Sequence, residues 1–140
     1  MSALNLLVGF VMVLAALFLI VPGALAAAGK LPGNPWFGLR VAEVRKDRAT
    51  WDRAHKVAGP IWIFGGVALA FGAAFAFIAN GWLWIAPIVL AIIAVIAFSI
   101  GGNVGARAAT LTDAPELAEP APQVDLDALR RAAGRADEER

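Results

Sequence analysis

Residues 4–28, LNLLVGFVMVLAALFLIVPGALAAA, contain no ionisable side chain. A helix needs about 20 predominantly apolar residues to cross the roughly 30 Å hydrocarbon core of a bilayer. Pro22 lies near the end of the run, where neighbouring helices are able to satisfy the backbone group that a proline leaves free. We therefore predict a first membrane-spanning helix over residues 4–28.

A cleaved secretory signal peptide is the alternative for this segment, because Ala24-Leu25-Ala26 resembles a cleavage site. A signal peptide begins with a cationic region, yet no Lys or Arg precedes Lys30. The run is also longer than the about 7–15 apolar residues of a typical signal-peptide core. We favour the uncleaved helix, and cleavage stays open as the second interpretation.

A second charge-free stretch covers residues 57–106 and is divided by Asn80-Gly81, a strong turn signal. Trp82 and Trp84 follow the turn, and tryptophan favours the membrane–water boundary. The pattern predicts two more spans, over residues 59–79 and 83–103. Since 60% of the chain is hydrophobic, against about 45–50% in soluble proteins, the expected fold class is an all-α, three-span helical bundle.

Small residues recur within the predicted spans. Gly66 with Ala70, and Gly72 with Ala76, are four residues apart, a spacing that lets helix backbones approach closely. We expect these pairs to pack helices within the monomer rather than to form a dedicated dimer face.

The charges are segregated along the chain. Seven Lys/Arg and three Asp/Glu give the segment 30–56 a charge of +4, whereas five Lys/Arg and eight Asp/Glu give residues 107–140 a charge of −3. Because Lys and Arg are retained on the cytoplasmic side, the 30–56 loop and the tail are expected inside, with the amino terminus and the Asn80-Gly81 turn outside. This predicts a membrane domain over residues 1–106 and a cytoplasmic tail over 107–140.

The tail has the composition of an extended linker. Residues 113–122 contain three prolines, and Pro-rich segments form semi-rigid spacers. A short helix over 125–139 is interrupted by Gly134 and would be marginal alone. We predict a disordered tail.

The loop between the first two spans carries more information than a plain cationic tether. Asn34-Pro35 predicts a turn, since the residue before proline is excluded from helical geometry, and Gly38 permits a positive φ. Asp47 is a candidate helix cap, so the second helix is expected to begin before the membrane. Trp51 and His55 are four residues apart on one face of that helix. We expect an ordered loop over residues 30–57, packed against this face.

These residues form a recognisable pattern. Asn34-Pro35-x-x-Gly38-x-Arg40, then Trp51-x-x-x-His55 and the Gly65-Gly66 pair, resemble the SdpI family of bacterial membrane proteins over about residues 30–70. Val41 stands where the family pattern has threonine. The motif and possible binding residues that the resemblance implies are Asn34, Pro35, Gly38, Arg40, Trp51 and His55.

The resemblance also implies a location and a function. It places the protein in the bacterial plasma membrane, and the best-known family member is an immunity protein that also sequesters a repressor at the membrane. The expected role is therefore immunity to a secreted antimicrobial peptide toxin, or membrane-anchored signalling. A structural or accessory subunit of a larger membrane complex is the alternative.

Two of the motif residues each have two candidate roles, one in binding or regulation and one in structure. Arg40 is expected either to contact a lipid phosphate or an acidic partner, or to lie at the interface as a snorkelling side chain. An unperturbed histidine has a pKa near neutral pH, so His55 would suit a pH switch, but an interfacial hydrogen-bonding role is favoured.

Several function classes are disfavoured. The chain has no cysteine and one histidine, so neither a metal site nor a cofactor is expected. No nucleophile motif is present, so we expect no enzyme. Charge-free spans disfavour an ion-coupled transporter. The expected partners are the bilayer, anionic phospholipid, a peptide toxin or another membrane protein, whereas nucleic acid is not expected because anionic lipid lies beside the basic loop.

Overall fold

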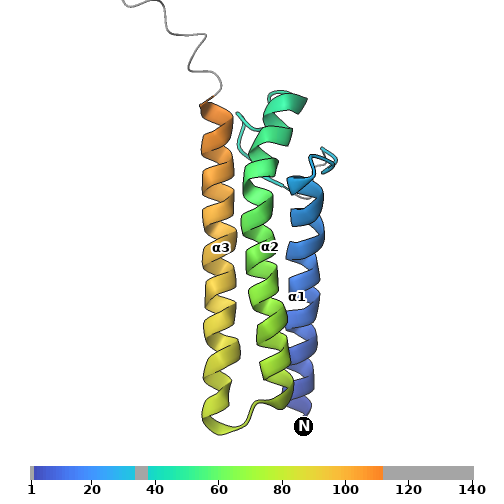
Figure 1. The fold of residues 1–140 in the computed structure, drawn as a ribbon, viewed down its shortest axis with the longest axis vertical. Helices are drawn as coiled ribbons and strands as arrows, with labels where there is room; N and C mark the ends of the chain where they lie inside the picture. The colour runs from blue at the N-terminus through green and yellow to red at the C-terminus, as the bar shows by residue number, and fades with distance from the viewer. Residues whose placement is uncertain (1, 34–37, 112–140) are drawn as a thin grey trace, which may run out of the picture.

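The computed structural model describes residues 2–33 and 38–111, and three long helices run side by side through it (Figure 1). They are α1 (Ala3–Ala27), α2 (Arg48–Ile78) and α3 (Ile85–Thr110), with a short 3₁₀ helix, η1 (Gly81–Trp84), before α3. All three are long and apolar enough to cross a membrane. The predicted all-α, three-span fold is confirmed.

Two helix boundaries differ from the predicted spans. Helix α2 begins at Arg48, before the predicted span, because Asp47 caps it as expected. Helix α3 continues to Thr110 rather than ending at residue 103. Alanine-rich sequence favours helix, and Arg107 in the last turn complements the helix dipole. Residues 107–110, which were predicted to be part of the disordered tail, therefore belong to α3, and the predicted disorder from residue 112 onward lies outside the described residues.

Most large side chains point away from the helix bundle. Leu14, Phe71 and Val95 expose 66%, 61% and 66% of their surface, and many other aliphatic and aromatic residues are similarly exposed. The buried positions are mostly alanine and glycine. An apolar surface of this extent suits acyl chains rather than water. The pattern agrees with a bundle that packs through small residues within a membrane.

Helix α2 lies between the other two (Figure 1), and among the described helices α1 and α3 each pack on it but not on each other. Glycines allow these close approaches. A Cβ added at Gly59 would lie 2.5 Å from the Ala27 nitrogen, and one at Gly105 would lie 2.7 Å from the Ala54 oxygen. Only small residues fit at either crossing.

The glycines singled out in the sequence also pack within the monomer. A Cβ at Gly66 would meet Ile20 of α1, and a Cβ at Gly72 would meet Met12 of α1. Ala70 is exposed, so it does not share the contact surface of Gly66.

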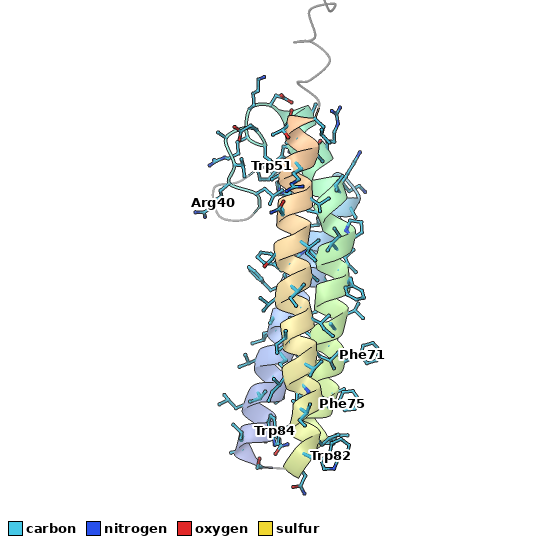
Figure 2. The ribbon with its side chains drawn as sticks, turned by 90° about the vertical axis from the view of Figure 1, so that its left-hand side faces the viewer. Arg40, Trp51, Phe71, Phe75, Trp82 and Trp84 are labelled. Atoms are coloured by element: carbon cyan, nitrogen blue, oxygen red, sulfur yellow. The ribbon has the colours of Figure 1, made fainter. Side chains whose placement is uncertain are left out.

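The α2–α3 hairpin closes at the predicted turn. Gly81 has φ +51°, which the lack of a Cβ makes accessible, and Trp82 is 80% exposed. Figure 2 shows Trp82 and Trp84 at the opposite end of the bundle from Arg40 and Trp51. We call the end with Trp82 and Trp84 the hairpin end, and the end with Arg40 and Trp51 the loop end.

A buried asparagine fastens α1 to α2 at the hairpin end. Asn5 Nδ2 donates to the carbonyl oxygens of Ala76 (2.7 Å) and Ala79 (2.8 Å). Its Oδ1 accepts from the Ser2 backbone nitrogen (3.1 Å), and the Ser2 hydroxyl caps α1. The Ala76 carbonyl also accepts from the Ala79 N–H, so the amide adds a second donor there and supplies one to the Ala79 carbonyl at the end of α2.

Candidate functional site

The amino-terminal turns of α2 rise beyond the apolar part of the helix and form the wall on which the loop rests. The Asp47 carboxylate accepts hydrogen bonds from the Thr50 backbone nitrogen and hydroxyl, both at 2.8 Å. These bonds, above all the one from the Thr50 N–H, lower the pKa of Asp47. Arg48 and Asp52 form an ion pair at 3.0 Å one turn further on. The first turn of α2 is thus held in helical geometry outside the predicted span.

Two aromatic rings on one face of α2 are buried beneath the loop. Trp51 and His55 are 5% and 1% exposed, and their ring centroids lie 3.9 Å apart at an interplanar angle of 31°. His55 in turn meets Trp62 edge-on, with centroids 5.9 Å apart. The four-residue spacing in the sequence therefore produces a continuous aromatic surface along the inner face of α2.

The rings of Trp51 and His55 each form one hydrogen bond with the loop backbone. Trp51 Nε1 donates to the Leu31 carbonyl oxygen at 3.2 Å, and the Leu39 backbone nitrogen donates to His55 Nε2 at 3.0 Å. The two bonded positions flank the segment that holds the Asn34-Pro35 motif. The loop is therefore held on both sides of its motif by neighbouring turns of one helix.

The hydrogen bonds define the protonation state of His55. Its Nε2 accepts from the N–H of Leu39, so that nitrogen carries no proton. Its Nδ1 lies 2.8 Å from the Trp51 carbonyl oxygen, which only accepts, so Nδ1 carries the proton. His55 is a neutral imidazole whose two nitrogens are both used by the backbone.

Gly38 is required for this contact. Its φ of +115° is rarely adopted by other residues, and an added Cβ would lie 2.5 Å from Trp51 Cη2 and 2.7 Å from His55 Nε2. The loop approaches the two rings as closely as it does because no side chain intervenes. We call Leu31, Gly38, Leu39, Trp51 and His55 the loop-attachment site.

Leu39 extends the contact to the third helix. Its side chain faces α3 at two glycines: a Cβ at Gly105 would lie 2.9 Å from Leu39 Cδ1, and one at Gly102 would lie 3.5 Å from Cδ2. Val44, further along the loop, is fully buried in the same apolar cluster as Trp51 and Trp62. The loop therefore packs against the bundle as part of its core.

The structure brings together three of the six predicted site residues, Gly38, Trp51 and His55. Arg40 is exposed and lies at the outer edge of the loop, whereas Trp51 lies on α2 beside the helix bundle (Figure 2). Asn34 and Pro35 lie outside the described residues. A binding role for any of the six stays a prediction.

Sequence reasoning missed the other contributors. Leu31 and Leu39 bind the two rings through backbone atoms, which no residue type reveals. Gly105, which Leu39 contacts, follows Gly101 by four residues, a spacing typical of helix crossings, but it lies beyond the predicted span of residues 83–103. Within the described residues, 2–33 and 38–111, no group of three His, Cys, Asp or Glu side chains is placed to hold a metal ion.

The geometry defines a class: a three-helix membrane protein whose first inter-helix loop is ordered by contacts with the second helix. Residues 30–101, which contain this loop, all of α2 and much of α3, match the model of the SdpI/YfhL protein family. The chain belongs to that family. Comparison with curated proteins and with solved structures gives no match.

Proposed function

We propose that this member of the SdpI/YfhL family is a non-catalytic binding protein of the bacterial plasma membrane that confers immunity to a secreted antimicrobial peptide. Its binding surface would be the loop over residues 30–57. The role in immunity is carried over from the family resemblance, the choice of the loop rests on the motif that it contains, and the ordering of the loop in the structure supports that choice.

The observation that carries the proposal is the two-point attachment of the loop. A flexible segment loses conformational entropy when it binds, whereas a segment that is already ordered does not lose it again. The bonds from Leu39 to His55 and from Trp51 to Leu31 order the loop in advance. Because these contacts use buried groups, they leave the outer side of the loop, including exposed Arg45, open to a partner.

We also propose that the loop lies on the cytoplasmic side, where its Lys and Arg residues would be retained. A peptide that inserts across the bilayer would then meet the loop at the inner membrane boundary. The loop's positive charge would favour an acidic segment of such a peptide.

Exposure of a deletion strain to spent medium from its parent tests this function. Loss of the gene is expected to raise sensitivity to the medium, and the wild-type gene is expected to restore survival. Trp51→Ala is expected to fail, whereas Trp82→Ala, which removes an exposed indole at the hairpin end, is expected to protect fully. Membrane levels of each variant are measured by immunoblot.

A deletion strain as resistant as its parent would contradict the proposal. So would full protection by Trp51→Ala at wild-type abundance. If the purified protein instead retains another membrane protein in stoichiometric amount and sensitivity is unchanged, the role of accessory subunit replaces that of immunity.

A further inference from the structure

A groove runs along α2 between α1 and α3, because these two helices do not pack against each other. It consists of two adjoining cavities of about 740 and 330 Å³ that share Phe18 of α1 and Phe98 of α3 as lining residues. Volumes of this size are typical of small-molecule sites. The groove adjoins the loop-attachment site, because Gly38 and Leu39 of that site line its loop end together with Val41.

The two ends of the groove differ in chemistry. The smaller cavity lies toward the bundle centre and is lined by apolar residues such as Leu19, Leu69 and Val95. The larger cavity, at the loop end, is lined by Ser99, Asn103 and Arg107 of α3. These three are spaced four residues apart and therefore form one polar stripe along the helix.

Among the described residues that line these two cavities, Arg107 is the one with an ionisable side chain. The charge-free part of α3, residues 85–106, is about 33 Å long at 1.5 Å per residue. That length matches the roughly 30 Å hydrocarbon core, so Arg107 lies where lipid phosphates begin. Asn103 is also exposed and lies one helical turn before Arg107, on its hairpin side.

We infer that this groove binds one anionic phospholipid, with its phosphate at Arg107 and Asn103 and an acyl chain along Phe18, Phe98 and Val95. The site pairs a guanidinium with a phosphate, for which arginine has matching geometry. Its polarity changes along the groove in the same direction as that of a lipid, from charged to apolar. A helix from a second copy of this chain fits the groove less well than a lipid, because it would place apolar side chains against the polar stripe.

Native mass spectrometry of the full chain tests the inference. The protein is reconstituted in nanodiscs of phosphatidylethanolamine and phosphatidylglycerol, released in mild detergent, and its lipid adducts are counted. Wild-type protein is expected to retain one phosphatidylglycerol in preference to phosphatidylethanolamine. Arg107→Gln should reduce that retention roughly tenfold, as expected for loss of one charge-assisted hydrogen bond, whereas Arg45→Gln, a cation outside the groove, should leave it unchanged.

A second variant tests the apolar part. Ala15→Phe fills the smaller cavity and is expected to remove bound lipid of both classes, while Ala74→Phe on the exposed face of α2 is expected to have no effect. Excess inorganic phosphate should not displace the lipid, since the acyl chain contributes to binding. Equal retention by the Arg107 and Arg45 variants, displacement by phosphate, or a dimer in place of the lipid adduct would overturn the inference.

Discussion

At the scale of single residues, Gly38 is a tightly constrained point in the described part of the loop. Gly38→Ala would place a methyl group against Trp51 and His55 at a φ of +115°. Such strained geometry costs about 1–3 kcal/mol, so the variant should lower the thermal stability of the detergent-solubilised protein. The attached loop should also become more sensitive to trypsin at Arg45.

Gly33 provides a matched control within the same loop. A Cβ at this position meets no atom within 4 Å. Gly33→Ala is expected to match the wild type in both measurements. Equal effects of the two substitutions would show that the close approach at Gly38 is not what orders the loop.

A substitution at His55 tests the attachment of the loop through a residue of α2. His55→Phe keeps an aromatic ring between Trp51 and Trp62 but removes the acceptor for the Leu39 N–H. An unpaired buried donor costs about 1–3 kcal/mol. Hydrogen exchange measured by mass spectrometry should therefore rise around Leu39, while the Leu31 side of the loop, held by Trp51, changes less. Unchanged protection around Leu39 would contradict the assigned bond.

At the scale of helices, Gly105 controls how closely α3 approaches α2. In Gly105→Ala the new Cβ would lie 2.7 Å from the Ala54 carbonyl oxygen, which is backbone and cannot turn aside. Overpacking of this kind costs about 1–3 kcal/mol, so the melting temperature should fall.

Gly102 lies on the same helix and serves as the control. Its Cβ would meet only Leu39 at 3.5 Å, an ordinary contact, so Gly102→Ala should be neutral. It could even stabilise α3 slightly, because alanine has the higher helix propensity. A similar loss of stability in both variants would contradict the packing of α3 described above.

The start of α2 should respond to pH through its cap. The Thr50 N–H lowers the pKa of Asp47. A carboxyl whose pKa is lowered by folding stabilises the fold above its ordinary pKa and loses this effect as the pH falls through the lowered value. Asp47→Ala should therefore increase exchange in the first turn of α2 at neutral pH, with a difference from wild type that disappears in acid.

Asp47→Ser keeps a capping oxygen without a titratable group. It should protect the first turn to the same extent at both pH values. If the wild type and the alanine variant differ equally at neutral and acid pH, the carboxylate is not the group that caps α2.

At the scale of the whole molecule, the sequence predicted the three long apolar helices and their order because absence of charge is a local property. The charge-free runs, the Asn80-Gly81 turn and the Asp47 cap each require only neighbouring residues. The loop end was less predictable. The four-residue spacing of Trp51 and His55 indicated a shared face, but the bonds to Leu31 and Leu39 depend on backbone atoms brought together by the folded loop.

The extent of α3 and the groove escaped prediction for a similar reason. The third span was predicted to end at residue 103, but α3 continues through alanine-rich sequence to Thr110. The polar stripe of Ser99, Asn103 and Arg107 becomes visible only when α1 is known to leave space beside α3.

Labelling of single cysteines on intact cells tests the central claim, that three membrane crossings place the loop on the face opposite to the hairpin. The chain has no cysteine, so Ser2→Cys, Arg45→Cys and Asn80→Cys each give one reactive site. With a membrane-impermeant maleimide, the account predicts labelling at positions 2 and 80 in intact cells, and at 45 only after permeabilisation. Labelling of position 45 together with position 80 in intact cells would contradict it.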